Sequence, residues 1–363
     1  MRVKLGDVCE RGSSNLKQSD VVELKGDYPI YGASGYIGNV DFYHQENSYV
    51  AVVKDGAGIG RTTLLPAKSS IIGTMQYLLP KDNVLTEYLY YVVSYMHLEK
   101  YFTGATIPHI YFKDYKNEEF NLDSVDKQRK IVDVLGKCES VIELRKNELQ
   151  LLDNLIKARF VEMFGTLNSP SQEFTKATLK ELCNKITDGK HGGCKVEKGT
   201  ERYFIGAREI YDDEVHYDTA PEINVDEFEK DYKRCNIEIG DFLIVNTGAT
   251  IGKSAITTDE RTEHTLLQKS VALLKVKKEL LNPVFLKWCY RVNMQMYIVE
   301  SASAQPNLLL SKINSTVIYV PDIELQNQFA DFVNQVNKSK VAVQKALDET
   351  QLLFDSLMQQ YFG

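Results

Sequence analysis

The two halves of this 363-residue chain repeat one another, and this duplication limits the possible folds more than any other feature of the sequence. The matching segments are residues 5–9 and 179–183, residues 52–61 and 244–253, and residues 126–128 and 324–326. Their offset rises from 174 to 192 and then to 198, so the insertions lie early in the second copy. Two copies of one unit predict two similar domains, related by an approximate two-fold axis and carrying two equivalent binding faces.

The composition fits two ordinary folded domains. Hydrophobic residues make up 43% of the chain and charged residues 26%, which is not the composition of a disordered protein. The formal net charge of -7 gives no general attraction to nucleic acid, although an acidic molecule can still carry a basic face. The six cysteines include no C-x-x-C pair, so neither zinc nor a disulfide framework is indicated. Because no signal-peptide pattern and no apolar run of about 18 residues occur, we expect a soluble, cytoplasmic protein with no membrane partner.

Each copy predicts an α+β domain. Short apolar runs bounded by turn residues predict strands, and apolar residues at helical spacing predict one helix in each domain. In the first copy, the strands fall at residues 49–53, 70–73 and 76–79, and the helix at 86–101. In the second copy, the clearest strands fall at 241–245 and 270–274, and the helix at 282–298.

A heptad pattern follows each domain and predicts a long helix that packs along another long helix. The apolar seam positions are Ile131, Leu135, Cys138, Ile142, Leu149, Leu152, Ile156 and Met163 in the first copy, and Phe329, Val333, Val336, Val343, Leu347, Phe354, Leu357 and Tyr361 in the second. Arg145, Arg159 and Lys340 interrupt the seam, which favours partial exposure or contact with a partner protein. At about 1.5 Å per residue the first helix is roughly 55 Å long, and short connections favour an antiparallel pair.

The predicted fold class is therefore α+β: two α/β domains in a pseudo-two-fold repeat, separated by two long antiparallel helices that resemble a coiled coil. A polar, turn-rich stretch after the first helix predicts a linker. In chain order, the parts are a domain at 1–124, a helix at 125–165, a linker at 166–177, a domain at 178–321 and a helix at 322–363.

One segment is close to a phosphate-binding P-loop. Residues 247–254 follow a predicted strand and contain Gly-Lys-Ser, but Thr247 stands where the motif requires a small residue. The equivalent segment of the first copy, residues 55–62, keeps the glycines and has no lysine, which indicates a scaffold turn. Residues 282–285, Asn-Pro-Val-Phe, are similar to the Asn-Pro-Pro-Tyr/Phe motif with which amino-methyltransferases hold a flipped adenine, but no glycine-rich cofactor loop precedes them. Because proline is common in the first turn of a helix, this segment indicates a helix start. No histidine motif predicts a metal site, and no nucleophile motif predicts catalysis.

The remaining candidates are polar, basic and aromatic residues on glycine-rich loops. Arg and Lys bind phosphates and guanine edges, Asn binds adenine, and loops reach into a groove. The candidate DNA-binding residues are Lys54, Arg61, His109, Tyr111 and Lys113 in the first domain, and Lys190, His191, Asn246, Thr250, Lys253, Asn307 and Lys312 in the second. Because Arg61 matches Lys253 and His109 matches Asn307 in the repeat, these residues favour a duplicated ligand-binding surface.

Several motifs in a fixed order carry a resemblance to a known family. They are the entrance segments at Leu5 and Leu179, the Gly-Ala-Gly-Ile-Gly-Arg and Gly-Ala-Thr-Ile-Gly-Lys turns, the segments at Pro108 and Pro306, and the run Pro321-Asp322-Ile323-Glu324-Leu325-Gln326 that opens the last helix. The first copy has Asn121-Leu122-Asp123 where this family usually has a proline. Over its whole length the chain resembles the specificity (S) subunit of a type I restriction-modification system.

This resemblance implies a DNA-binding subunit without catalytic activity of its own. Each domain would be a target-recognition domain that reads one half of a bipartite site on double-stranded DNA. The helix pair would set the spacer between the half-sites and dock two methyltransferase (M) subunits, which methylate adenine at N6. Restriction/translocase (R) subunits would join for cleavage, and AdoMet, Mg and ATP would bind to these partner subunits and not to this chain.

Three alternatives remain open at this point. The first is the specificity subunit of a type II-like or other DNA-methylation defence system, which the identity of the co-purifying subunit would distinguish. A nucleotide-binding protein built on residues 247–254 would hydrolyse ATP and lose this activity in Lys253→Ala. A purely structural scaffold would confer no sequence preference on DNA when bound to its methyltransferase partner.

Overall fold

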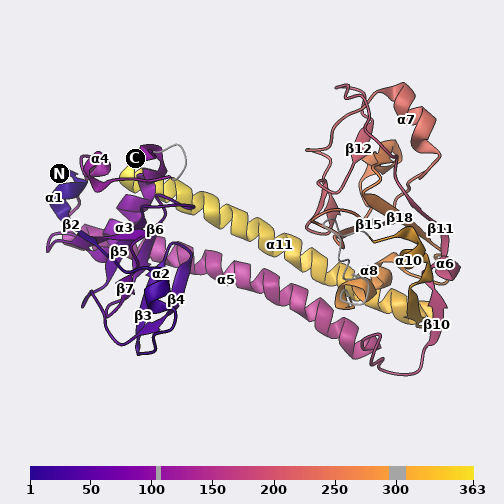
Figure 1. The fold of residues 1–363 in the computed structure, drawn as a ribbon, viewed down its shortest axis with the longest axis horizontal. Helices are drawn as coiled ribbons and strands as arrows, with labels where there is room; N and C mark the ends of the chain where they lie inside the picture. Colours follow the sequence, from indigo (N-terminus) through magenta and orange to yellow (C-terminus); the bar gives the residue numbers. More distant parts are fainter. Residues whose placement is uncertain (104–107, 294–307) are drawn as a thin grey trace. The chain divides into compact units, whose positions relative to one another are not determined.

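The computed structural model describes residues 1–103, 108–293 and 308–363. The chain divides into two compact units, which are coloured along the sequence in Figure 1. The first unit contains Met1–Asn147 together with Gln344–Gly363, and the second contains Glu148–Val343. Each of the two long helices therefore begins in one unit and ends in the other, and each unit holds one domain with parts of both helices.

The first domain is built on a four-stranded antiparallel sheet. In spatial order, its strands are β2 (Cys9–Ser13), β8 (Met75–Pro80), β5 (Tyr49–Val53) and β6 (Thr62–Leu65). Strand β5 is buried on both faces, which explains its unbroken apolar sequence. Val50 and Val52 share a core with helix α3 (Thr86–Tyr95), whereas Tyr49 and Ala51 pack on the opposite side of the sheet.

A second, three-stranded sheet in the order β4-β3-β7 completes this domain. Strands β3 (Tyr28–Gly32) and β4 (Gly35–Val40) form a hairpin, and β3 runs parallel to β7 (Ser70–Ile71). The other elements are β1 (Arg2–Lys4), which pairs with β9 (Glu119–Asn121), and the short helices α1 (Leu5–Val8), α2 (Gln18–Val21), η1 (Leu98–Tyr101) and α4 (Phe112–Tyr115).

The second domain repeats the four-stranded sheet with the same topology. Its spatial order is β11 (Cys183–Asp188), β18 (Val271–Val276), β15 (Phe242–Val245) and β16 (Ser254–Ile256). The surrounding elements recur as well: β10 (Thr175–Thr178) pairs with β19 (Val317–Val320), and α6 (Leu179–Leu182), α8 (Pro283–Val292) and α10 (Leu310–Ser315) match α1, α3 and α4. The predicted duplication is confirmed at the level of strand order.

The copies differ next to the parallel strand pair. Strand β12 (Tyr203–Ile205) runs parallel to β17 (Thr265–Leu267), as β3 does to β7, but no third strand of this sheet appears among the described residues. The chain instead forms the hairpin β13 (Ile210–Tyr211) and β14 (Glu214–Val215), helix α7 (Val225–Tyr232) and the turn η2 (Glu260–His264). The insertions early in the second copy therefore account for the structural difference between the domains.

Most predicted elements are confirmed, with changes at their ends. The helix predicted at 86–101 stops at Tyr95, because His97 adopts a left-handed conformation with φ of 50° before the η1 turn. The helix predicted at 282–298 is α8, and its predicted last residues lie outside the described part of the chain. The segment predicted as a linker, 166–177, includes most of strand β10.

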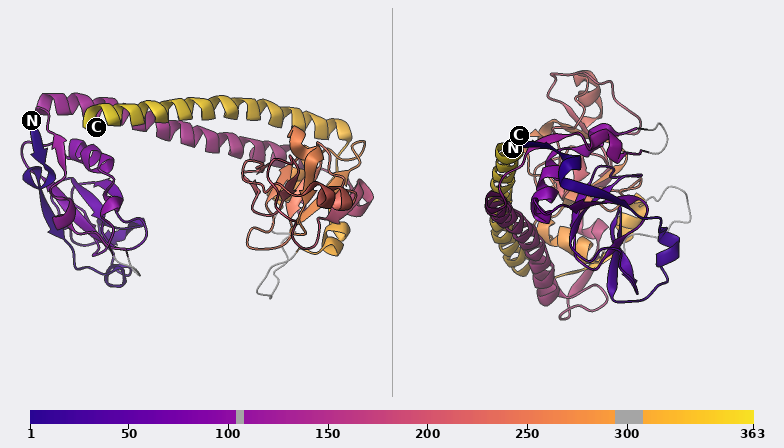
Figure 2. Two further views of the ribbon diagram at one scale, coloured as in Figure 1. Left: turned by 90° about the horizontal axis from the view of Figure 1, so that it is seen from above. Right: turned by 90° about the vertical axis from the view of Figure 1, so that its left-hand side faces the viewer.

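The two long helices, α5 (Val125–Phe164) and α11 (Ile323–Phe362), are antiparallel in each unit (Figure 2). In the second unit, the end of α5 packs on the start of α11, with the rings of Phe160 and Phe329 5.3 Å apart. In the first unit, Ile131 near the start of α5 shares a core with Met358 near the end of α11. The predicted antiparallel pairing is confirmed.

The heptad seam is also confirmed. Of its members, Ile131, Leu135, Ile142 and Ile156 on α5 and Phe329, Val333, Val336 and Val343 on α11 are buried. Lys340, which interrupts the seam, forms an ion pair with Asp153 at 2.7 Å. Phe160 lies outside the predicted stripe, yet it is fully buried, because it packs on Phe285 of α8 as well as on α11.

A buried glutamine ties each long helix to its own domain. Gln128 accepts a hydrogen bond from the Leu85 amide (2.9 Å) and donates to the carbonyls of Asn83 and Asp123. Gln326 does the same in the second copy: it accepts from the Asn282 amide (2.9 Å) and donates to the carbonyls of Leu280 and Pro321. Both side chains are fully buried and satisfied, so the glutamine of the repeated motif fixes where the helix leaves the domain.

Candidate nucleic-acid interface

The two glycine-rich turns are β-hairpins with the same hydrogen bonds. In the first domain, Val53 N donates to Arg61 O and Gly60 N donates to Val53 O, both at 2.9 Å. In the second, Val245 N donates to Lys253 O at 2.8 Å and Gly252 N to Val245 O at 2.9 Å. Each turn connects two antiparallel strands, whereas a P-loop leads from a strand into a helix. Residues 247–254 are therefore a hairpin turn without the strand-to-helix geometry of a P-loop, as the interpretation of a scaffold turn predicts.

Glycine is required in these turns by the backbone conformation. Gly60 and Gly252 have φ values of 82° and 90°, a region that residues with a Cβ rarely adopt. A Cβ on Gly60 would also lie 2.5 Å from the backbone nitrogen of Glu99. The turns therefore hold the two repeat-equivalent cations, Arg61 and Lys253, at the end of a rigid hairpin, where both side chains are exposed.

Four of the candidates in the first domain meet in one cluster. The ring of Tyr111 lies 4.1 Å from that of His109, and Lys113 Nζ lies 5.0 Å over the Tyr111 ring. Asp55, at the entrance of the glycine-rich turn, contacts both His109 Nδ1 and Lys54. Burial of the ring and the nearby charge of Lys54 lower the pKa of His109.

This cluster presents an exposed aromatic ring and an exposed cation beside the glycine-rich turn. Tyr111 and Lys113 are exposed, whereas Lys54 and His109 are half-buried and hold the loop in place. Gly56 N donates to Pro108 O at 3.1 Å, which joins the turn to the His109 segment. Arg61, the fifth candidate, points to another part of the domain, where its Nη1 donates to Ala33 O at 3.1 Å.

The candidates in the second domain have different environments. Thr250 and Lys253 lie on the glycine-rich turn, but Asn246 is buried, and its carbonyl accepts a hydrogen bond from Leu308 N at 2.7 Å. Asn246 therefore supports the turn from inside the domain. Lys312 is exposed on α10, and Asn307 lies outside the described residues.

Lys190 and His191 lie on a turn that is anchored in the domain. Lys190 forms ion pairs with Asp231 (2.8 Å) and Glu227 (3.3 Å), and the hydrogen bond to Asp231 raises the pKa of the Lys190 ammonium. The positive charge of Lys190 is therefore balanced by carboxylates of its own domain. His191 is exposed, with Nε2 3.6 Å from Asp188, a nearly buried carboxylate that also contacts Arg234.

Sequence reasoning missed Tyr36, an exposed tyrosine of the β3–β4 hairpin. Tyr36 is 61% exposed, and its hydroxyl donates to Asn39 Oδ1 at 2.9 Å. Its ring lies 6.0 Å from that of Tyr31 on the neighbouring strand. The signal available in the sequence is Tyr-Gly-Ala-Ser-Gly-Tyr at residues 31–36, which places a tyrosine on each side of a glycine-rich turn.

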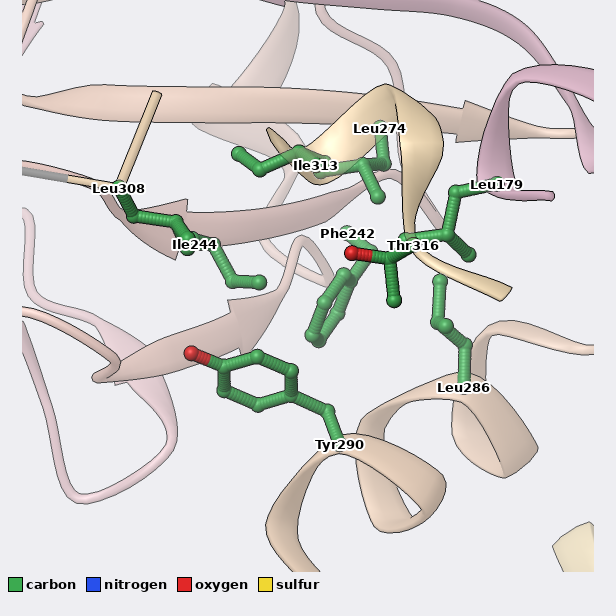
Figure 3. A pocket seen from close by; sticks show the side chains of 9 residues that line it. All are labelled: Leu179, Phe242, Ile244, Leu274, Leu286, Tyr290, Leu308, Ile313 and Thr316. Carbon is green, nitrogen blue, oxygen red and sulfur yellow. The ribbon is translucent and has the colours of Figure 1, made fainter. Parts of the chain in front are cut away.

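An apolar pocket in the second domain belongs to its core (Figure 3). It lies between helices α8 and α10 and the four-stranded sheet, and its lining is hydrocarbon apart from Tyr290 and Thr316. Thr316 Oγ1 donates to the carbonyl of Lys312 at 2.9 Å, and burial raises the pKa of Tyr290 to about 12. Such a lining fits side-chain packing and not polar ligand recognition.

Among the residues that the structure describes, no group of three or more His, Cys, Asp or Glu side chains is arranged to hold a metal ion. Within the same residues, no helix combines the length and the apolar character needed to cross a membrane.

Comparison with known proteins gives consistent matches. The family model for the type I restriction modification DNA specificity domain matches residues 1–154 and 171–350. A stretch of 91 residues is 30% identical to the type I restriction enzyme MjaIX specificity subunit of Methanocaldococcus jannaschii, and covers 24% of this chain but only 21% of that protein.

Two solved structures share the fold over nearly the whole chain. The S subunit of a type I restriction-modification system from M. genitalium has a TM-score of 0.60 at 15% identity, covering 100% of this chain and 96% of that one. A chain from a structure on complex assembly and conformational transition of the type I R-M system has a TM-score of 0.57 at 14% identity, covering 99% and 96%. At these identities the likeness is one of fold.

Proposed function

Because this chain belongs to the type I restriction-modification DNA specificity family, we propose that it selects the DNA sequence on which a type I complex acts. Each domain reads one half of a bipartite site on double-stranded DNA. The observation that carries this proposal is the duplicated hairpin. Two sheets with the same strand order present Arg61 and Lys253 on turns with the same hydrogen bonds, and the surroundings of the two turns differ. Equal frames position the phosphate backbone, and unequal surroundings read different bases.

The helix pair is proposed to set the spacer and to dock two methyltransferase (M) subunits. Apolar residues remain exposed along one stripe of α5, at spacings of seven, three, seven and four residues: Val134, Val141, Leu144, Leu151 and Leu155. Residues at these spacings lie on one side of a helix, and an exposed apolar stripe of this kind is typical of a protein-binding surface. On α11, Val341 and Leu352 are exposed as well.

Catalysis is assigned to the partners in this proposal. The M subunits bind AdoMet and transfer its methyl group to adenine N6, and restriction/translocase (R) subunits use Mg and ATP for cleavage. This chain contributes recognition and geometry only. A complex of this composition acts on intracellular DNA, which places the proposed site of action in the cytoplasm.

The proposal is tested by expressing the chain together with the methyltransferase subunit of the same system and mapping N6-methyladenine across the host genome. We expect one motif with two different specific halves separated by a fixed number of unspecified bases. The control is the methyltransferase subunit expressed alone. An identical methylation pattern with and without this chain would contradict the proposal.

A further inference from the structure

The two domains differ in what lies beside strand β3 and beside its counterpart β12. Each of these two strands runs parallel to the strand that follows the β5–β6 or β15–β16 hairpin: β3 pairs with β7, and β12 pairs with β17. In the first domain, β4 then adds to β3 as the edge of the sheet. In the second, the inserted segment replaces it. Sequence-specific reading of two different half-sites requires elements that differ between the copies, and the β3–β4 hairpin is such an element.

The hairpin has one buried and one exposed face. Ile30 and Val40 pack into a small core with Val21 and Ile72, so the hairpin is held firmly on the domain. The other face carries the exposed Tyr36 and Asn39, whose Oδ1 accepts a hydrogen bond from the Tyr36 hydroxyl, and the half-buried Tyr31 beside Tyr36. This hydrogen bond orients the Asn39 amide on an exposed strand.

The hairpin strands and their tip carry no negative charge, and the nearest exposed carboxylates along the chain, Asp27 and Asp41, flank the opposite end. Residues 28–40 contain no Asp or Glu, although the chain has 50 such residues. A cation adjoins the tip, where the Arg61 side chain of the glycine-rich turn donates to Ala33 O. A backbone can also approach closely, because a Cβ placed on Gly35 or Gly38 would meet nothing within 4 Å.

We propose that the β3–β4 hairpin is the base-reading element of the first domain, with Tyr36 and Asn39 as its specificity-determining residues. This inference rests on the proposed function. The major groove of B-DNA admits a two-stranded β-ribbon, and an Asn amide can pair with the N6 and N7 atoms of adenine. Arg61, proposed above as a phosphate contact, also joins the glycine-rich turn to the hairpin tip through its bond to Ala33 O.

The test uses the whole chain in complex with its methyltransferase subunit. Tyr36→Ala, Tyr36→Phe and Asn39→Ala are compared with wild type by genome-wide N6-methyladenine mapping and by the rate of methylation of a cognate duplex. The control is Val22→Ala, because Val22 in the same domain is also 61% exposed and lies outside the hairpin. Tyr36→Phe keeps the ring and removes only the hydroxyl that orients Asn39.

We expect Asn39→Ala and Tyr36→Ala to relax or change one half of the motif and to lower the rate at the original site by roughly tenfold, the size of one good base contact. Tyr36→Phe should relax the same half more weakly, and Val22→Ala should match wild type. Retention of the other half-site shows that a variant is folded and assembled.

The experiment separates failure of the hairpin inference from failure of the proposed function. If wild type methylates a bipartite motif and all three hairpin variants keep both its halves and its rate, the hairpin does not read bases and only this inference is overturned. If the wild-type complex shows no sequence preference, the proposed function is overturned and the hairpin inference with it.

Discussion

At the scale of single residues, the repeat separates cations that face outward from cations that are paired inside the domain. Arg61 and Lys253 occupy equivalent positions and are exposed, whereas Lys190 is held between Asp231 and Glu227. The exposed pair is therefore free of the carboxylate contacts that hold Lys190, and it is the pair proposed here to contact DNA phosphates. The list of candidates from the sequence did not make this distinction, because the partners of Lys190 lie about forty residues away along the chain.

Charge reversal at either turn should weaken DNA binding. In Arg61→Glu or Lys253→Glu, a proposed phosphate contact is replaced by repulsion. We therefore expect the affinity of the assembled complex for DNA to fall about tenfold, and the slope of log K against log[salt] to decrease in magnitude by about one. The measurement is a titration of cognate duplex at several salt concentrations. Lys338→Glu, an equal charge change at an exposed position of α11, is the control. Unchanged affinity at physiological salt would remove the tested residue from the contact set.

The two buried glutamines should contribute to stability. Gln128→Leu or Gln326→Leu leaves one backbone amide and two carbonyls without their partner, which costs about 1–3 kcal/mol for each group that water cannot reach. We expect a lower midpoint of thermal unfolding in both variants. Gln335→Leu, at an exposed position of α11, should leave it nearly unchanged. Equal midpoints for all three variants would show that water or repacking replaces the lost bonds.

At the scale of elements, the long helices were predictable and the contacts at the loops were not. A heptad repeat depends on local spacing, so the seam around Leu135 and Val333 could be identified from the sequence alone. The contact of His109 with Asp55 and that of Arg61 with Ala33 join segments 54 and 28 residues apart. Residue types and spacing carry no information on which distant loops meet, so these pairs required the fold.

The exposed stripe of α5 gives a prediction about docking. Leu144→Asp places a charge at a position that is 66% exposed, so it should leave folding intact and weaken the proposed apolar contact by tenfold or more. The measurement is co-purification of the methyltransferase subunit with this chain. Gln150→Asp introduces the same charge on another side of the same helix and should keep the complex. Loss of the complex in both variants, or in neither, would argue against the stripe as the docking site.

The length of the helices gives a second prediction. Inserting seven residues after Asn147 in α5 and seven after Val343 in α11 adds one heptad to each helix, so the seam stays in register. The helices then grow by about 10 Å, which corresponds to roughly three base pairs of DNA. We expect the spacer of the methylated motif to lengthen while both half-sites stay the same. A changed half-site with an unchanged spacer would contradict the proposed role of the helices.

At the scale of the whole molecule, the chain is one structural unit used twice. The same strand order, entrance helix and glutamine contacts occur in each copy, and each long helix ends on the other domain: Phe164 packs on Phe285 of α8, and Phe362 lies 5.4 Å from Tyr88 of α3. The duplication seen in the sequence is therefore also present in the structure, as two domains with the same strand order. Where the copies differ, the sequence showed only the position of the insertions and not the elements they form.

Exchange of a whole domain should be modular. Replacing residues 1–124 with the first domain of another family member should change one half of the methylated motif and leave the other half and the spacer intact. The reason is that the second domain contains its own sheet, turn and core. Methylome mapping of the chimera measures this directly, with the parent chain as the reference. A change in both halves would mean that the domains do not read independently.

The glutamine contacts have a consequence for how such chains diversify. Gln128 and Gln326 bind only main-chain atoms, and the residues that supply those atoms differ between the copies: Asn83 and Leu280, Leu85 and Asn282, Asp123 and Pro321. A joint built on the peptide backbone places no demand on side-chain identity. Domains of different sequence can therefore be joined to one helix scaffold without compensating side-chain changes at this joint.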